Sequence, residues 1–328
     1  MIIPVILFLL GFVLLIFGGN WFVDGSTGIA KRYHIPELLI GATVVSIGTT
    51  LPEVMVSATS AAKGIGDIAY GNAIGSIICN TSLIAAITIA VKPAPVNKKE
   101  LIKPVCFFFA AAVFYAAVAC VKGYFSRPVG IILLAVFIIY MVINVKDAIS
   151  GKAVPADEGD AHEDEEGDQK PGSLLLDLVR IVAGAACITV GANFLVDNGT
   201  IIATALGVPT SVIALTFVAL GTSLPEFVTA VTSLIKGHGA LSLGNVIGAN
   251  LFNLVLVSGV SITIKPFKIP VEKTIAGMNA SLVVDTPVML GVMLLLTIPS
   301  IVRGKLSRLQ GILLLAIYIS YVVFQFVL

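Results

Sequence analysis

The segment GTTLPE at residues 48–53 occurs a second time, with one substitution, as GTSLPE at residues 221–226. The similarity extends to residues 43–80 and 216–253, in which 17 of 38 positions are identical at a constant offset of 173. In both copies the segment is followed by the pattern GN..G....N, in which each dot is one variable position. The chain therefore contains an internal duplication, with a glutamate at the same place in both copies.

The composition is that of an integral membrane protein. Hydrophobic residues make up 57% of the 328 residues and charged residues 12%, about half of the roughly 25% found in soluble domains. The mean hydropathy is +1.04. A carboxylate is costly inside hydrocarbon, so Glu53 and Glu226, which lie within apolar stretches, each need a bound partner. Duplicated polar sites inside a membrane protein are typical of ion carriers.

Ten apolar runs are long enough to cross a membrane as helices. They cover residues 2–23, 38–62, 68–91, 101–121, 128–145, 174–196, 212–235, 241–264, 283–302 and 306–328. We therefore expect an all-α integral membrane protein with ten transmembrane helices. Residues 1–150 would form a first five-helix repeat, residues 151–172 an acidic cytoplasmic linker, and residues 173–328 a second five-helix repeat.

An odd number of helices in each repeat gives the two repeats inverted topology in the membrane. An extracellular N-terminus puts 14 of the 20 Lys and Arg residues in cytoplasmic loops, as the positive-inside rule favours. Lys265, Lys268 and Lys273 disagree with this orientation. We expect a multi-pass protein of the cell membrane with both termini extracellular. The linker, with eight carboxylates at positions 157–168, is predicted to be solvated and disordered.

The polar residues of each GT[ST]LPE segment lie on one face of a helix, at i, i+3, i+4 and i+7. They are Ser46, Thr49, Thr50 and Glu53 in the first copy, and Ala219, Thr222, Ser223 and Glu226 in the second. Hydroxyl and carboxylate oxygens are ligands for hard cations such as Na⁺ and Ca²⁺. The three histidines lie in loops or at span ends, so we expect no transition-metal site in the membrane.

Each glutamate follows a proline, and a proline frees the carbonyl group four residues earlier. Pro52 would free the Gly48 carbonyl and Pro225 the Gly221 carbonyl. In a membrane a freed carbonyl needs protein, water or an ion as a partner. The alternative is a purely structural kink. We expect an interrupted helix at both prolines.

The second pattern reads GNAIGSIICN in one copy and GNVIGANLFN in the other. Its glycines are expected to let helices approach closely: Gly71, Gly75, Gly244 and Gly248. Its buried asparagine side chains need partners, and their carbonyl oxygens can complete a cation shell. Ser76 and Asn80 lie one helical turn apart, and Asn253 lies one turn after Ala249.

These motifs, over essentially the whole chain, resemble the two α-repeats of the sodium/calcium exchanger family, in its compact prokaryotic form. The resemblance implies Na⁺ entry driving Ca²⁺ extrusion by alternating access, with the first and sixth helices sliding against a rigid core. It implies that Glu53 and Glu226 are the central carboxylates and that Thr49 and Thr222 help to hold the metal. The further cation ligands implied are Thr50, Ser223, Ser76, Asn80 and Asn253, together with backbone carbonyls at Ser46 and Ala219.

The chain departs from the family pattern at two site positions. Ala249 lacks the hydroxyl that would mirror Ser76, and Asn253 stands where some relatives carry aspartate. The missing hydroxyl concerns one sodium subsite. The site would then hold two acids rather than three, which resembles potassium-independent members.

Three other functions compete with antiport of Na⁺ and Ca²⁺. A cation/proton exchanger would also use buried glutamates, but typically presents a GNAxE type of motif. A channel builds its filter by symmetric assembly around a pore. An enzyme is not expected, because no HExxH or GxSxG motif is present. We expect no cofactor beyond the transported ions, no nucleic-acid partner, and a monomer sufficient for transport. Asp285, just before Pro287, is predicted to be a helix N-cap.

Overall fold

The structure, a computed structural model, describes residues 2–149, 173–206, 221–271, 274–275 and 277–327. Among these residues, nine helices are long and apolar enough to cross a membrane. They correspond to nine of the ten predicted spans. The remaining span, residues 212–235, is described only from Gly221 onward, where the shorter helix α11 lies. The predicted acidic linker falls outside the described residues.

The helices are mostly long and follow one another with short connections. In the first repeat they are α1 (Ile2–Tyr33), α2 (Glu37–Ile40), η1 (Gly41–Val45), α3 (Ser46–Ala62), α4 (Gly66–Cys79), η2 (Asn80–Ala85), α5 (Ala86–Val91), α6 (Lys98–Lys122) and α7 (Arg127–Ile149). In the second repeat they are α8 (Leu174–Ala205), α11 (Leu224–Ile235), α12 (Gly239–Phe252), η5 (Asn253–Val257), α13 (Ser258–Ile264), η6 (Ser281–Asp285), α14 (Thr286–Arg303) and α15 (Arg308–Val327). Helices labelled η are π-helices.

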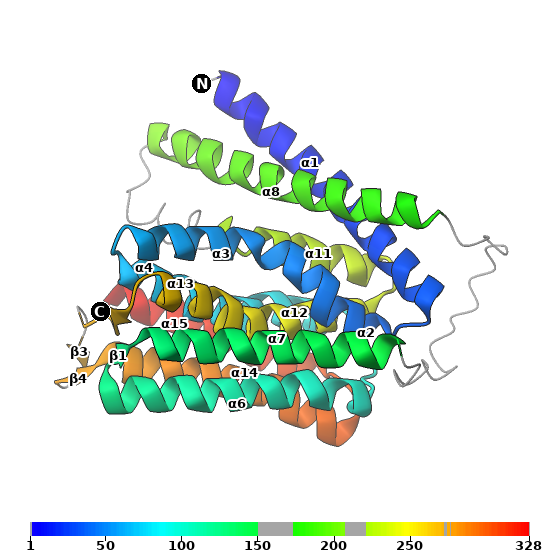
Figure 1. Cartoon of the computed structure of the whole chain (residues 1–328). Helices are drawn as coiled ribbons and strands as arrows, with labels where there is room; N and C mark the ends of the chain where they lie inside the picture. The colour runs from blue at the N-terminus through cyan, green and yellow to red at the C-terminus, as the bar shows by residue number, and fades with distance from the viewer. Residues whose placement is uncertain (1, 150–172, 207–220, 272–273, 276, 328) are drawn as a thin grey trace.

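Short strands join the connections at one end of the molecule. β1 (Tyr124–Phe125) pairs antiparallel with β2 (Phe267–Lys268), and β3 (Thr274–Ile275) pairs with β4 (Met278–Asn279). These two-residue pairs lie near the label C in Figure 1. Apart from them, the described chain is helical, as an all-α membrane protein requires.

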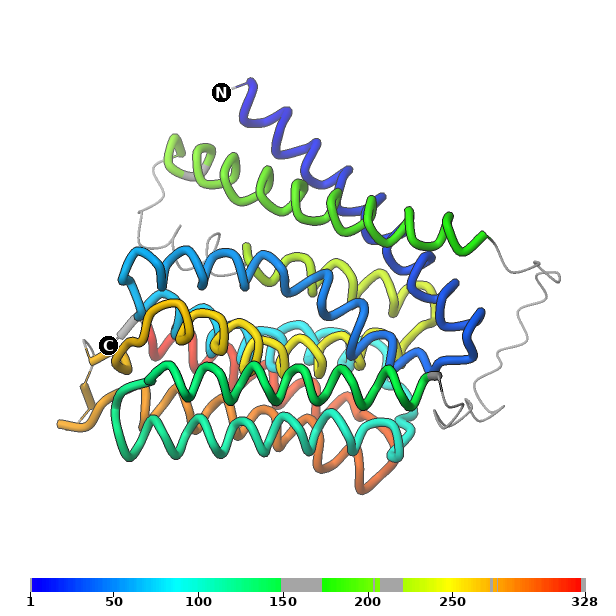
Figure 2. Tube along the Cα trace, viewed as in Figure 1, coloured from blue at the N-terminus to red at the C-terminus, as the bar shows by residue number. Residues whose placement is uncertain are grey.

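Helices α1 and α8 form a layer of their own on one side of the molecule, as the ribbon in Figure 1 and the trace in Figure 2 show. Helices α3 and α11 lie beneath this layer, and the remaining helices form a bundle below them. The buried side chains divide accordingly. A small cluster joins α1 and α8 to the neighbouring helices, and a large cluster fills the bundle.

Glycines allow α1 and α8 to pack closely and antiparallel. A Cβ added at Gly11 would lie 2.8 Å from the carbonyl oxygen of Gly191, and one at Gly18 would lie 2.9 Å from the carbonyl oxygen of Gly184. Small residues of this kind let transmembrane helices approach. The contacts run in opposite directions along the two helices. Because α1 and α8 open the two repeats, the repeats have inverted topology, as predicted.

The first helix is longer than predicted. The sequence indicated a span over residues 2–23, whereas α1 continues to Tyr33. The polar residues after Val23 do not end the helix, because its own backbone satisfies their hydroxyls. Ser26 Oγ donates to the carbonyl of Phe22 at 2.7 Å, and Thr27 Oγ1 donates to that of Val23 at 3.0 Å.

Asp285 does not act as the predicted N-cap. Its backbone is helical, with φ −61° and ψ −49°, and its side chain makes no capping hydrogen bond. Instead, Tyr321 Oη and Gln325 Nε2 of α15 donate to Asp285 Oδ1 at 2.9 and 2.8 Å. The prediction was wrong because the helix begins earlier, with the π-helical turn at Ser281.

Gly244 and Gly248 place α12 directly against α2 and η1. A Cβ at Gly244 would lie 2.2 Å from the carbonyl oxygen of Leu38, and one at Gly248 would lie 2.5 Å from the Cα of Ala42. The close approach predicted for these two glycines is confirmed. At Gly71 and Gly75 no described atom lies within 4 Å of an added Cβ, so the close approach predicted there is not seen among the described residues. The counterparts of Leu38 and Ala42 in the second repeat, residues 211 and 215, lie outside them.

We predict that Gly248→Ala lowers thermal stability, because its methyl group must displace helix backbone. Overpacking of this kind costs about 1–3 kcal/mol, so the apparent melting temperature in detergent should fall by several degrees. Gly291→Ala is the control. At Gly291 in α14, no described atom lies within 4 Å of an added Cβ. Equal melting temperatures for the two variants would contradict the packing described for α12.

Candidate cation site

The two glutamates of the duplicated motif are fully buried and lie close together. Glu53 on α3 and Glu226 on α11 are both 0% exposed. Thr50 Oγ1, three residues before Glu53 on α3, donates to Glu226 Oε1 across the repeat boundary at 3.4 Å, which places the two glutamates beside each other. Each repeat therefore contributes one carboxylate to a shared buried centre. Two like charges in such a place need a counter-charge.

Two matching hydrogen bonds cross between the repeats beside these carboxylates. Thr49 Oγ1 of α3 donates to Asn245 Oδ1 of α12 at 3.3 Å. Thr222 Oγ1 donates to Asn72 Oδ1 of α4, also at 3.3 Å. The offset of 173 converts one pair into the other. The GT[ST]LPE segment of each repeat is thus held against the GN..G....N segment of the other, so both repeats are needed to build one centre.

The symmetry of the centre is broken where the repeats differ in sequence. Asn72 Nδ2 donates to Ser57 Oγ at 2.8 Å and to the backbone carbonyl of Glu53 at 3.2 Å. The corresponding Asn245 Nδ2 has no hydrogen-bond partner in the described part of the chain, because Ala230 stands where the first repeat has Ser57. The two halves of the site therefore present different hydrogen-bonding groups.

A group of buried polar atoms in this region has no hydrogen-bond partner among the residues that the structure describes. It comprises both carboxylate oxygens of Glu53, Oε2 of Glu226, Oγ of Ser223, and both polar side-chain atoms of Asn80 and of Asn253. Native proteins leave few buried polar groups unsatisfied, so a concentration of them requires an explanation such as a bound ion. The group is rich in oxygen, and carboxylate, amide and hydroxyl oxygens are the donors that Na⁺ and Ca²⁺ accept.

The asparagines of the site mark the start of two π-helices. The α-helix α4 changes to the π-helix η2 at Asn80, and α12 changes to η5 at Asn253. Ser258 Oγ donates to the carbonyl of Asn253 at 3.2 Å. Such π-turns occur frequently at functional sites. The sequence gives no period that predicts them, although the asparagine is found at the same place in both repeats.

A third π-helix, η1, precedes Ser46. Ser46 Oγ donates to the carbonyl of Gly41 at 2.7 Å and to the carbonyl of Asn245 at 3.0 Å. The side chain of Ser46 therefore has partners within the protein, and it ties η1 to α12. The backbone carbonyl of Ser46 accepts a long side-chain bond, of 3.4 Å, from Thr49 Oγ1.

The predicted helix interruption is present in one repeat only. Helix α3 continues through Pro52, whereas Thr222 and Ser223 form a turn before α11 begins. Pro225 is in the first turn of α11. A backbone N–H in this turn has no partner within the helix, so the missing N–H of proline costs no hydrogen bond. The expectation was therefore wrong for the first repeat, in which the other residues of the helix maintain it around the proline.

The structure describes most of the remaining predicted site positions. Ser76 and Ala249 are buried, and Thr222 is half-buried. Ala219 lies outside the described residues. Within the described chain, no three His, Cys, Asp or Glu side chains gather as a metal cluster. Any cation held by Glu53 and Glu226 would therefore depend on hydroxyl, amide and backbone oxygens for the rest of its shell.

Sequence reasoning did not single out two buried hydroxyls on α11. Thr229 and Ser233 are both 0% exposed, and their hydroxyls have no hydrogen-bond partner within the described ranges. They follow Glu226 at i+3 and i+7, which places all three on one face of the helix. This i, i+3, i+7 spacing can be recognised in the amino-acid sequence alone. It extends the polar face from the carboxylate towards the end of α11.

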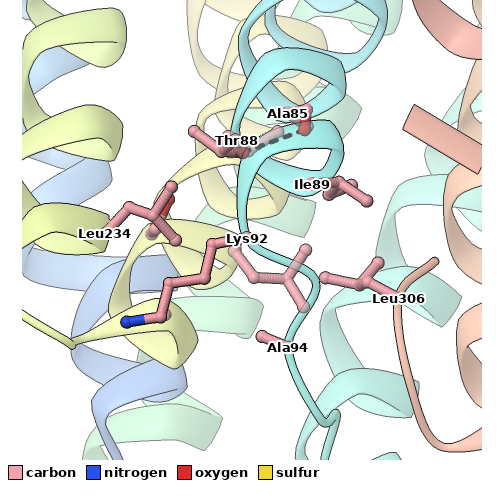
Figure 3. Close-up of a pocket in the computed structure, with 11 residues that line it drawn as sticks. Ala85, Thr88, Ile89, Lys92, Ala94, Leu234 and Leu306 are labelled. Carbon is pink, nitrogen blue, oxygen red and sulfur yellow. Dashed lines mark hydrogen bonds between the residues drawn. The ribbon is translucent and has the colours of Figure 1, made fainter. Parts of the chain in front are cut away.

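A small pocket lies at that end of the molecule but lacks the chemistry of the cation site. Figure 3 shows Lys92, Leu234 and Leu306 around it, with Thr88 above. Its lining includes Lys92 but no carboxylate. A lysine ammonium repels cations, so this pocket is not the place where Na⁺ or Ca²⁺ would be held.

Comparison with known proteins agrees with this geometry. The family model described as sodium/calcium exchanger protein matches residues 3–146 and 176–327. An uncharacterized membrane protein of Methanocaldococcus jannaschii is 36% identical over 312 residues, covering 95% of this chain and 94% of the relative. The sodium/calcium exchanger MaX1 of Methanosarcina acetivorans is 28% identical over 350 residues, covering 98% of each.

Solved structures of the sodium-calcium exchanger NCX_Mj have the same fold. The structure soaked with 2.5 mM Na⁺ and 10 mM Sr²⁺ has a TM-score of 0.81 and 32% identity, with 98% of each chain covered. The structure soaked with 2.5 mM Na⁺ and 0.1 mM Ca²⁺ has a TM-score of 0.80 and the same identity and coverage. With a family match over most of its length and two buried carboxylates at corresponding places in an internal duplication, the chain belongs to the sodium/calcium exchanger protein family.

Proposed function

We propose that this protein is an antiporter that exchanges Na⁺ for Ca²⁺ across the cell membrane by alternating access. The observation that carries the proposal is the buried meeting of Glu53 and Glu226, with several oxygen atoms around them that lack partners. The names of the relative MaX1 and of NCX_Mj, both sodium/calcium exchangers, support the choice of ions.

The two carboxylates give a physical reason for obligatory exchange. One Ca²⁺ between Glu53 and Glu226 neutralises both carboxylate charges. Because each Na⁺ carries a single charge, a different number of Na⁺ ions is needed to neutralise the same two carboxylates. An empty site leaves two buried charges uncompensated, which costs several kcal/mol per ion. The empty protein therefore resists the change between its two open states. The loaded protein does not, so one ion leaves only when another replaces it.

The remaining oxygens complete the proposed cation shell. Thr49 and Thr222 lie beside the carboxylates and, with Glu53 and Glu226, form the proposed metal ligand set. Further proposed ligands are Thr50, Ser223, Ser76, Asn80 and Asn253, with backbone carbonyls at Ser46 and Ala219. No cofactor takes part besides the transported ions. A single chain supplies all of these residues, so a monomer suffices.

The layered fold fits a moving part and a fixed part. The pair α1 and α8 is joined closely within itself by glycine contacts, and it meets the neighbouring helices in a small apolar cluster separate from the large one. We propose that this pair moves against the bundle, which holds α4 and α12 with their asparagines in place. Both termini are proposed to be extracellular, on the basis of the distribution of Lys and Arg.

We predict that Glu53→Gln and Glu226→Gln each reduce sodium-driven calcium uptake by about 100-fold or more, because each leaves a divalent ion with one compensating charge. The measurement is isotope uptake into proteoliposomes under a sodium gradient. Asp285→Asn is the matched control, since it removes a carboxylate from a spanning helix outside the site. Near-normal uptake in either glutamine variant would refute the site.

Ala249→Ser is expected to change the apparent affinity for sodium more than that for calcium. The substitution restores, in the second repeat, the hydroxyl that Ser76 offers in the first. Half-saturating concentrations of both ions are measured in the same vesicles. Ala112→Ser, which adds a hydroxyl at a buried position of α6, is the control. An unchanged sodium dependence for Ala249→Ser would show that this position does not face a sodium subsite.

Calcium uptake should persist when the proton gradient is collapsed and only the sodium gradient remains. This follows from charge compensation by Na⁺ rather than by protonation of the carboxylates. Uptake is compared with and without a protonophore at fixed sodium gradient. Loss of uptake with the protonophore, together with uptake driven by a pH step alone, would identify a cation/proton exchanger instead.

A further inference from the structure

The duplication extends beyond the cation site to four charged residues. In α1 the sequence Asn20–Asp24 reads NWFVD, and in α8 the sequence 193–197 reads NFLVD, at the same offset of 173. After α3 the chain reads KGIG from Lys63, and after α11 it reads KGHG from Lys236, again at that offset. Asp24 and Lys236 therefore have Asp197 and Lys63 as their counterparts.

The first of these two pairs is formed in the structure. Lys236 Nζ lies 2.6 Å from Asp24 Oδ1, and the same ammonium group donates to the backbone carbonyl of Asn20 at 3.3 Å. The ion pair fastens α1 to the end of α11. It is partly exposed, with the Lys236 side chain 26% and the Asp24 side chain 44% accessible.

The second pair is not formed. Lys63 and Asp197 are both exposed, and neither makes an ion pair with any residue in the described part of the chain. The local backbone does not account for the difference. Lys63 and Lys236 both follow directly on the end of a helix, with φ of −72° and −77°. Both precede a glycine with positive φ, of 83° and 85°.

The two repeats also differ in how closely their first helix packs on the helix that carries the glutamate of the other repeat. A Cβ at Gly19 of α1 would lie 2.8 Å from Val228 Cγ1 and 2.9 Å from Thr232 Oγ1 of α11. Met55 of α3 is the counterpart of Val228 and is 65% exposed. Thus α1 covers α11, whereas α8 does not cover α3 at the corresponding place. Figure 1 shows α8 in a layer apart from α3.

We propose that Asp24–Lys236 and Asp197–Lys63 are two reciprocal ionic latches that close in turn at opposite ends of the protein. The inference rests on the proposed alternating access. In an inverted repeat, the opposite state is reached when the two repeats exchange conformations. That exchange opens the bridge at Lys236, draws α8 onto α3, and brings Asp197 to Lys63. None of the four residues belongs to the proposed cation shell, so the latches set the balance of states and not ion affinity.

The size of the effect follows from the exposure of the pair. A partly exposed ion pair changes an equilibrium by a factor of about five or less. Removing one latch therefore shifts the balance between the two open states by about that factor without stopping transport. The two latches act on opposite states, so their removal shifts the balance in opposite directions.

The test compares Asp24→Asn with Asp197→Asn in proteoliposomes of known orientation. The readout is the rate at which a single reporter cysteine near each end reacts with a membrane-impermeant maleimide, in a background without the four native cysteines. Asp24→Asn should raise reactivity at the Lys236 end and lower it at the Lys63 end, and Asp197→Asn should do the reverse. Asp67→Asn, at an exposed carboxylate near Lys63 that forms no ion pair in the described chain, should change neither.

Charge exchange and cross-linking make the test independent of folding defects. Asp24→Lys combined with Lys236→Asp should restore the reactivity of the unmodified protein. A bifunctional maleimide should link the cysteines of Lys63→Cys and Asp197→Cys, and this link should stop exchange. The proposal would be overturned if Asp24→Asn and Asp197→Asn changed the maleimide reactivity in the same direction or not at all. It would also be overturned if the two introduced cysteines could not be cross-linked. Absence of sodium-driven calcium uptake in the unmodified protein would instead refute the proposed function.

Discussion

Two carboxylates with no exposed surface are the most demanding feature of this protein. At close range in a medium of low dielectric constant they repel each other strongly, and the hydrocarbon around the helices offers no solvent to disperse the charge. Glu53 and Glu226 are nevertheless placed beside each other by two different helices, with Thr50 of α3 bonded to Glu226. Much of the surrounding structure can be understood as support for this placement. Hydroxyls of α3 and of the turn before α11 lie at the site. Asn72 of α4 and Asn245 of α12 accept hydrogen bonds from these hydroxyls. The π-helices η2 and η5 begin at Asn80 and Asn253.

The duplication explains how a single chain builds such a site, and its imperfections explain how the site can work. The crossed bonds from Thr49 to Asn245 and from Thr222 to Asn72 make each repeat complete the other. A perfectly symmetric molecule would be open or closed at both ends alike. Here α1 lies on α11 and Lys236 binds Asp24, while the described residues do not make the corresponding contacts at the other end. One sequence pattern therefore supports two local arrangements, which alternating access requires.

The sequence was sufficient for the features that depend on composition and on repetition. Apolar runs predicted the spanning helices that the structure describes, and the repeated GT[ST]LPE segment identified the two glutamates that meet. Features that depend on tertiary contacts were not predictable in this way. The extension of α1 past Asp24 depends on hydroxyls bonded within the helix, and the role of Asp285 depends on donors from α15. The continuity of α3 through Pro52 and the π-turns at Asn80 and Asn253 have no periodic signal, because each depends on how neighbouring helices pack.

The central claim is that one divalent cation is held between the carboxylates of the two repeats. Its most direct test is anomalous diffraction from crystals of this protein soaked in Sr²⁺ at low Na⁺, with a second data set at high Na⁺. The expected result is a single strong peak within coordination distance of both Glu53 and Glu226, which weakens as Na⁺ is raised. A peak bound by only one of the two carboxylates, or no peak between them at saturating Sr²⁺, would contradict the claim.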